Sequence, residues 1–274
     1  MNRRPAIARM IGHMALTAGL LIGLAGCKDD KADANRLSVF CAAGIRLPID
    51  QLKEEFIADR PGVTVAMQFG GSGELLSQLE LTPADDRPDV YIAGEESYAQ
   101  DAQAKGLVDR IETLAYFVPV IAVARDRASE LNIRTLADLA RPGLKVALGE
   151  PRGPAVGKVS DRMLRAASLA AVCENAVAHG STVQEMARTV MLGHADATII
   201  WDATARQGDF AKTLTTIAIP GAPTVRIVIC RVSDTPRAEL ADAFIDYVRT
   251  GDSSRAAFTK YGFTVAAPTT APAP

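Results

Sequence analysis

Glycine- and serine-rich turns in front of helical segments are the places in this sequence that could do chemistry. Residues 70–73, Gly-Gly-Ser-Gly, lie between a β-rich run and a helical one. A helix N-terminus offers unpaired N–H groups with a partial positive charge, and these bind anions. Glycine lets the backbone approach a ligand closely, and Ser72 adds a hydroxyl. The turn is therefore a candidate ligand-binding site.

Similar turns recur along the chain, at residues 40–44, 149–157, 180–183 and 200–202. In an open α/β sheet, ligands gather outside the carboxyl ends of the strands, where turns of this kind lie. Each turn alone is weak evidence, because many strand–helix turns contain such residues. Gly44 is also explained by turn geometry, and Trp201 by packing in a core.

Two segments resemble catalytic motifs but lack residues that those motifs require. Residues 70–74 lack the final glycine of the G-x-S-x-G nucleophile elbow, and no histidine has an evident route to Ser72. Residues 152–159 differ from a phosphate-binding P-loop, because Arg152 replaces its first glycine and Val159 replaces the Ser or Thr that holds magnesium. We therefore expect a protein that is not an enzyme.

The amino-acid composition excludes further classes of protein. The chain has 274 residues, a formal net charge of −2, 48% hydrophobic and 23% charged residues, as in soluble globular proteins. A strongly basic nucleic-acid binder is excluded. Three histidines leave little basis for a metal centre, and we expect no cofactor and no free metal cation.

Cys41, Cys173 and Cys230 have apolar neighbours and are predicted to be buried thiols. Glu95 and Glu96 are interpreted as solvated acids of a helix's first turn.

Strand-like and helical segments alternate through the body of the chain. Strands are expected at 37–41, 63–69, 89–93, 118–124, 144–148, 197–200 and 224–230. Helices are expected from 48 and from 155 onward, and over 73–81, 95–105, 183–192, 236–249 and 254–261. This alternation predicts parallel sheets with helices on both faces. The length favours two such α/β lobes over one uninterrupted sheet.

The first residues have the layout of a secretory signal peptide. Three arginines precede an uncharged stretch whose apolar centre is too short to span a membrane. Residues 24–27, Leu-Ala-Gly-Cys, resemble the lipobox of bacterial lipoproteins, which implies cleavage before Cys27 and acylation of that residue. The alternative is a plain signal peptide with Cys27 as a bystander. Residues 27–36 are predicted to be a flexible stalk, and residues 265–274 a disordered tail.

Taken together, six segments resemble the periplasmic molybdate-binding proteins of ABC transporters, within the extracellular solute-binding class. The resemblance covers residues 37–263. It is carried by residues 40–43, 69–73, 88–92, 149–157, 199–203 and 258–263, in that order. The family fold is α/β, with two hinge-linked lobes that close on a ligand cleft. The implied division is 1–26 signal peptide, 27–36 stalk, 37–117 plus 225–264 lobe 1, 118–224 lobe 2 and 265–274 tail.

The resemblance also implies ligand-binding residues. Gly44 falls where the family has a serine, so only its backbone N–H remains. Ser72 keeps both its hydroxyl and its N–H, whereas Ala155 and Val183 are expected to donate through their backbones. Trp201 replaces a family tyrosine and offers an indole N–H.

Arg46 and Arg152 are close in sequence to two of the turns that carry these residues. Two interpretations are open: they compensate for the lost hydroxyl donors, or they face solvent.

The function implied by the resemblance is capture of a tetrahedral oxyanion, molybdate or tungstate first, by a lipid-anchored protein outside the cytoplasm. The partners expected are an ABC transporter permease and, through Cys27, a membrane; the protein is expected to be a monomer. One alternative is an oxyanion-sensing module that presents its closed state to a membrane partner. Another is a binding protein for a different small anion such as sulfate.

Overall fold

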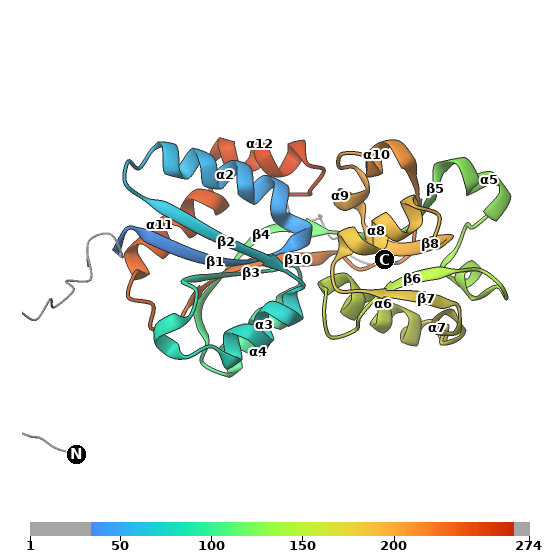
Figure 1. The fold of residues 1–274 in the computed structure, drawn as a ribbon, viewed down its shortest axis with the longest axis horizontal. Coiled ribbons are helices and arrows are strands. Elements are labelled where there is room, and N and C mark those ends of the chain that lie inside the picture. Colours follow the sequence, from blue (N-terminus) through green and yellow to red (C-terminus); the bar gives the residue numbers. More distant parts are fainter. Residues whose placement is uncertain (1–33, 266–274) are drawn as a thin grey trace, which may run out of the picture.

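The computed structural model describes residues 34–265, which form two α/β lobes lying side by side along the long axis of the molecule (Figure 1). Each lobe contains one five-stranded sheet with helices on both of its faces. The expected two-lobed fold is therefore confirmed. The helices in the described range include none that is both long and apolar enough to cross a membrane.

The first lobe is built on the sheet β2-β1-β3-β10-β4. Its strands are β1 (Arg36–Ala42), β2 (Thr64–Gly70), β3 (Val90–Ala93), β4 (Val108–Phe117) and β10 (Val225–Val232). Helices α2 (Arg46–Ala58), α11 (Ala238–Arg249) and α12 (Gly251–Lys260) cover one face, and α3 (Ser72–Leu81) and α4 (Glu96–Ala104) cover the other. Two short 3-10 helices, η1 (Ala43–Ile45) and η2 (Ala84–Asp86), complete this lobe.

The second lobe is built on the sheet β7-β6-β8-β5-β9. Its strands are β5 (Pro119–Ala124), β6 (Val146–Gly149), β7 (Ala176–Gly180), β8 (Ala197–Trp201) and β9 (Leu214–Ala218). The helices are α5 (Ala128–Leu131), α6 (Ala155–Ala166), α7 (Ala171–Glu174), α8 (Val183–Met191), α9 (Asp202–Ala205) and α10 (Phe210–Thr213), with 3-10 helices η3 (Arg125–Arg127) and η4 (Leu136–Ala140).

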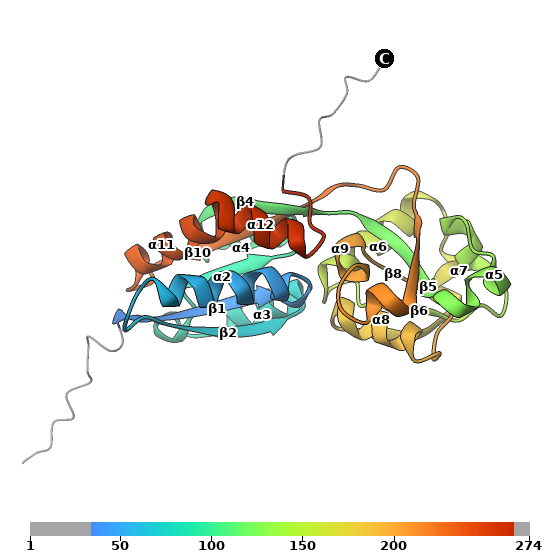
Figure 2. The same cartoon turned by 90° about the horizontal axis from the view of Figure 1, so that it is seen from above.

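Both sheets are mixed, which corrects the expectation of parallel sheets. β1 runs parallel to β2 and β3, but β10 is antiparallel to β3 and β4. Likewise β6 is parallel to β7 and β8, whereas β5 is antiparallel to β8 and β9. The cause is the crossing of the chain between lobes, from β4 into β5 and back into β10 (Figure 2). β5 and β10 each begin where the chain crosses into a lobe, so they run opposite to β8 and β3, which end at that side of the lobe.

The expectation of buried thiols is confirmed for Cys41 and Cys230, and burial raises the pKa of both. The expectations for Cys173 and Glu95 are wrong. Cys173 is exposed, because the short helix α7 turns only Val172 of its residues into the core. Glu95 is buried rather than solvated, since it lies at the start of α4 where the second lobe covers it.

The predicted signal peptide, Cys27 and most of the predicted stalk and tail lie outside the described residues. At the stalk's end, Arg36 already pairs with Thr64 in the β1–β2 ladder. The carbonyl of Asn35 accepts a 2.9 Å hydrogen bond from the Thr64 N–H. The sheet therefore begins one residue earlier than the hydrophobic pattern predicts, because backbone pairing does not require an apolar side chain.

Candidate functional site

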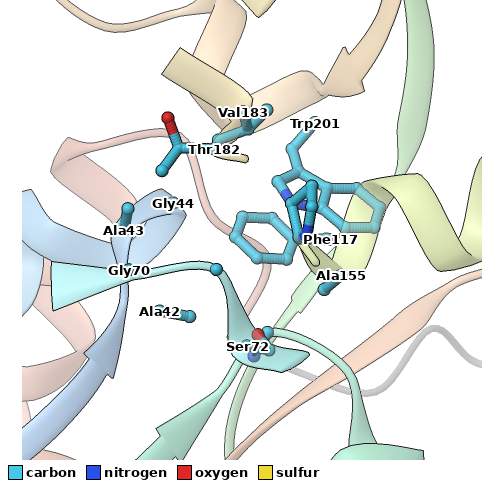
Figure 3. Close-up of a pocket in the computed structure, with 13 residues that line it drawn as sticks. Ala42, Ala43, Gly44, Gly70, Ser72, Phe117, Ala155, Thr182, Val183 and Trp201 are labelled. Carbon is cyan, nitrogen blue, oxygen red and sulfur yellow. Dashed lines mark hydrogen bonds between the residues drawn. The ribbon is translucent and has the colours of Figure 1, made fainter. Parts of the chain in front are cut away.

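A small pocket lies at the junction of the two lobes, and all five positions singled out in the sequence line it (Figure 3). Gly44 and Ser72 come from the first lobe, and Ala155, Val183 and Trp201 come from the second. The cavity volume is about 20 Å³, measured for the centre of a water-sized sphere. A space of this size accepts a compact group of a few atoms and has no room for a peptide or a sugar.

Three helix N-termini meet at this pocket. Ser72, Ala155 and Val183 are the first residues of α3, α6 and α8, each of which follows a strand of its sheet. The first N–H groups of a helix have no partner within it and carry a partial positive charge. Pro154, before α6, provides no side-chain cap. The arrangement therefore directs backbone donors from both lobes toward one small volume.

Ser72 is positioned to donate its hydroxyl proton. Its Oγ accepts a 3.0 Å hydrogen bond from the N–H of Gly94, and its carbonyl accepts a 2.7 Å bond from the hydroxyl of Tyr91. Burial raises the pKa of Tyr91 well above its usual value, so this phenol stays protonated as a donor. Because Gly94 occupies a lone pair of Oγ, the remaining hydroxyl hydrogen is free for a group in the pocket.

Aromatic rings close the opposite side of the pocket. The indole of Trp201 stacks on the ring of Phe117, with centroids 4.6 Å apart and planes 4° from parallel (Figure 3). Position 44 faces this pair: a Cβ on Gly44 would lie 3.4 Å from Phe117 Cζ, Trp201 Cδ1 and Val183 Cγ1. This wall of the pocket is largely apolar, and Gly44, which has no side chain, contributes no hydroxyl group to it.

Neither arginine considered from the sequence lines this pocket. Arg46 forms a 3.1 Å ion pair with Asp50, and its guanidinium lies 4.8 Å from the centroid of the Phe69 ring. Arg152 is exposed, although its carbonyl lies beside Gly73. Among the described residues that line the pocket, none has an ionisable side chain.

Asp202, the acid nearest in sequence to Trp201, is directed elsewhere. Its Oδ1 accepts a 3.1 Å hydrogen bond from the N–H of Val118, and its Oδ2 lies 3.3 Å from Nη2 of Arg206. The carboxylate is therefore matched outside the pocket and does not add negative charge to its lining.

The lobes touch around the pocket through direct hydrogen bonds. The N–H of Gly73 donates to the carbonyl of Gly153 over 2.8 Å, and Nε2 of Gln184 donates to the carbonyl of Ala43 over 2.8 Å. A Cβ on Gly71 would lie only 2.7 Å from the carbonyl oxygen of Ser181. Glycine at 71 and 73 thus permits the close approach of the two backbones.

A cluster of charges also joins the lobes beside the pocket. Lys158 on α6 hydrogen-bonds Ser97 and lies 4.3 Å from the centroid of the Tyr98 ring. Its Nζ is 4.0 Å from Glu95, and Nη1 of Arg162 is 3.9 Å from the same carboxylate. Two cations of the second lobe therefore face a buried acid of the first.

Two lining residues were not singled out in the sequence, Gly94 and Phe117. Gly94 directly follows the predicted strand 89–93, so the rule about strand ends could have found it. Phe117 ends β4, a strand that the hydrophobic pattern did not predict, and gave no such signal. The described part of the chain also contains no group of three or more His, Cys, Asp or Glu that could hold a metal ion.

Comparison with known proteins gives a consistent result. The family model for bacterial extracellular solute-binding proteins matches residues 37–264. The molybdate-binding protein ModA of Mycobacterium bovis is 27% identical over 259 residues, 90% of this chain and 95% of that protein. A putative binding protein of Haemophilus influenzae is 25% identical over 165 residues, 60% of this chain and 65% of that protein's length.

Among solved structures, the periplasmic molybdate-binding protein of Azotobacter vinelandii aligns with a TM-score of 0.66 at 16% identity, over 84% of this chain and all (100%) of that one. At this identity the likeness concerns the fold, which is the same two-lobed arrangement.

Proposed function

Because the chain belongs to the family of bacterial extracellular solute-binding proteins, we propose that it captures a tetrahedral oxyanion, molybdate or tungstate, and delivers it to an ABC transporter. The family acts outside the cytoplasm and binds solutes rather than converting them. The relatives named as molybdate-binding support the choice of ligand.

The observation that carries this proposal is the convergence of three helix N-termini and the Ser72 hydroxyl on one pocket without charged side chains. A buried anion needs its oxygens hydrogen-bonded. N–H and O–H groups meet this need without bringing a second charge that must also be desolvated. Gly44, Ser72, Ala155, Val183 and Trp201 form the proposed binding site.

Selectivity follows from the same donors. N–H groups donate only, and Ser72 Oγ already accepts one hydrogen bond from Gly94, so the pocket offers the O–H of a protonated oxyanion few acceptors. A fully deprotonated ion is therefore preferred over a hydrogen phosphate. The small cavity adds a size limit.

Binding is proposed to proceed by lobe closure. One lobe comprises residues 37–117 with 225–264, and the other comprises residues 118–224. The ion first meets the donors of one lobe, and donors of the other lobe then stabilise the closed state by their differential affinity for it. We further propose that the protein acts as a monomer held at a membrane by acylated Cys27.

Fluorescence of the sole tryptophan tests the proposal, because Trp201 lines the pocket. Titration of the purified protein with molybdate, tungstate, sulfate and phosphate is expected to change its emission, at the lowest concentrations for molybdate and tungstate. Unchanged emission and unchanged thermal stability with all four ions would remove the proposed function. If only sulfate changes the emission, the proposed ligand is sulfate and not molybdate.

A further inference from the structure

A side chain of the second lobe holds the peptide group between Ala43 and Gly44, which belongs to the first lobe. The carbonyl of this peptide is that of Ala43, and its N–H is that of Gly44. Nε2 of Gln184, the second residue of α8, donates to the carbonyl over 2.8 Å. Because a trans peptide is planar and its C=O and N–H point to opposite sides, this bond fixes the direction of the Gly44 N–H.

The two ends of this peptide face different spaces. Gly44 lines the small pocket, Gln184 lines a second cavity between the lobes, and Ala43 lines both (Figure 3). Gln184 thus approaches the carbonyl from the side of the second cavity. The N–H on the opposite side of the peptide is left for the small pocket.

The Gly44 N–H is available to a ligand and is a strengthened donor. Gly44 lies in the first turn of the 3-10 helix η1, where N–H groups have no partner within the helix. The carbonyl of Ala43 accepts two hydrogen bonds, one from the N–H of Arg46 and one from Gln184. Hydrogen bonds to a carbonyl polarise its peptide, so the N–H of the same peptide donates more strongly.

The amide of Gln184 contributes little to the contact between the lobes apart from this bond. Its Oε1 is buried and has no hydrogen-bond partner among the described residues. Turning the amide over would place Oε1 against the carbonyl oxygen of Ala43, two acceptors with no proton between them. An unmatched buried oxygen costs free energy, which offsets the gain from the bond to Ala43. The side chain therefore serves the peptide of Gly44 more than it serves closure itself.

On the basis of the proposed function, we propose that Gln184 is a positioning residue for the bound oxyanion. When the lobes close, it orients and polarises the peptide between Ala43 and Gly44, so that the Gly44 N–H donates to the ion. Helix α8 then acts on the ion twice, directly through the N–H of Val183 and indirectly through Gln184. The support falls at position 44, which has no side chain to act as a donor.

Calorimetry with molybdate, tungstate and sulfate on the full-length protein is the first test. Gln184→Met keeps the length of the side chain and suits a helix but cannot donate, and it is expected to weaken binding about tenfold. Gln207→Met is the matched control, because Nε2 of Gln207 also joins the lobes, by a 3.1 Å bond to the carbonyl of Tyr261, which does not line the pocket. This control is expected to weaken binding less than about threefold. Equal losses in both variants would mean that Gln184 is only a contact between lobes.

Nuclear magnetic resonance observes the peptide itself. A protein labelled with ¹³C at alanine carbonyls and ¹⁵N at glycine gives correlated signals from Ala–Gly peptides alone. The sequence contains four of these, of which 43–44 and 93–94 lie among the described residues. The second is an internal reference, because the N–H of Gly94 donates to Ser72 Oγ in the same pocket and has no bond to Gln184.

Saturating ligand is expected to move the Ala43 carbonyl and the Gly44 N–H signals of the parent downfield. In Gln184→Met the carbonyl shift is lost and the N–H shift is reduced by about half or more, whereas Gln207→Met keeps both. The 93–94 signals are the same in the parent and in both variants. A Gly44 shift that is unchanged in Gln184→Met overturns the inference.

Gln184→Glu provides a second variant should Gln184→Met fold poorly. At neutral pH a carboxylate accepts hydrogen bonds only, and an acid suits the first turn of a helix. The same loss of the Ala43 carbonyl shift is expected, and its retention counts against the role of Gln184.

The two proposals fail in different ways. If none of the ions binds the parent protein, the proposed function fails and this inference with it. If the parent binds an ion and Gln184→Met binds it equally well, the inference is wrong and the proposed function stands.

Discussion

At the scale of single residues, the Ser72 hydroxyl contributes to both the fold and the proposed binding, so its removal has two consequences. Ser72→Ala leaves the buried N–H of Gly94 without its acceptor and removes one donor from the pocket. We expect oxyanion affinity to fall by about 1 to 3 kcal/mol, roughly five- to 150-fold, measured by calorimetry. The midpoint of thermal unfolding is expected to fall as well.

Ser160→Ala is the matched control for this loss of stability. Ser160 is also buried, and its Oγ donates to the carbonyl of Gly157 within α6, away from the pocket lining. Its removal is expected to lower thermal stability without a comparable change in affinity. Equal losses of affinity in both variants would show that Ser72 acts only through the stability of the fold.

Gly44 is coupled to Trp201 by contact. A Cβ at position 44 makes van der Waals contact with three side chains at 3.4 Å, so we expect the further oxygen of Gly44→Ser to crowd them. Overpacking of this kind costs about 1 to 3 kcal/mol, and here we expect it to weaken ligand binding, because Gly44 and Trp201 belong to different lobes. Restoration of a hydroxyl donor alone therefore does not improve binding.

The double variant Gly44→Ser with Trp201→Tyr tests this coupling by calorimetry. A smaller ring at 201 makes room for the serine, so the double variant is expected to bind more tightly than either single variant. Gly44→Ala, which adds only the Cβ, is expected to have the mildest effect. Additive losses in the double variant would show that the two positions act independently.

The residues of the pocket were predictable to different degrees from the sequence. Ser72, Ala155 and Val183 each follow a turn rich in glycine, serine or proline and begin a helix, and this local pattern is visible without a structure. The stack of Phe117 on Trp201 was not predictable, because it joins residues 84 positions apart in sequence. Side-chain packing between lobes leaves no periodic signal.

At the scale of elements, α6 and α4 form the charged contact between the lobes. Lys158 and Arg162 on α6 both lie within 4.0 Å of Glu95, whose carboxylate is covered by the second lobe. A partly buried pair is screened by salt less than an exposed one. We expect Lys158→Gln to weaken oxyanion affinity about three- to tenfold by destabilising the closed state.

Affinity measured at low and high ionic strength checks this role. The parent protein is expected to lose affinity as salt rises, and Lys158→Gln is expected to lose less. Lys212→Gln is the control, because Lys212 pairs with Asp209 within the second lobe and both side chains are 77% exposed. The same salt dependence in the parent and in Lys158→Gln would rule out an electrostatic contribution of α6 to closure.

The strands that the hydrophobic pattern missed share a physical cause. β7 and β9 are edge strands of the second sheet and alternate between half-buried and exposed positions, and β4 carries Asp109, Arg110 and Glu112 among its residues. The strands that were predicted, such as β5 and β8, are buried over nearly their whole length. Continuous burial gives a continuous apolar run, whereas the short edge strands β7 and β9 have few large apolar residues. The edge strand β2 was predicted because Val65, Met67 and Phe69 alternate along it.

At the scale of the whole molecule, the two backbones come so close that a single methyl group would separate the lobes. A Cβ on Gly73 would lie 1.9 Å from the carbonyl oxygen of Arg152 and 3.0 Å from that of Gly153, and both belong to the second lobe. Gly73→Ala therefore obstructs closure and also disturbs the hydrogen bond from Gly73 to Gly153. The first lobe alone is unaffected, since alanine suits the first turn of α3.

Small-angle X-ray scattering and calorimetry measure this obstruction together. With a saturating oxyanion, the parent protein is expected to become more compact, whereas Gly73→Ala stays extended and binds at least about a hundredfold more weakly. Gly153→Ala is the control: its Cβ would meet only Glu150 of the same lobe, at 3.3 Å. Because the closed state gathers donors from both lobes, a Gly73→Ala variant that bound with the parent's affinity would mean that one lobe suffices, and closure would then have no part in ligand capture.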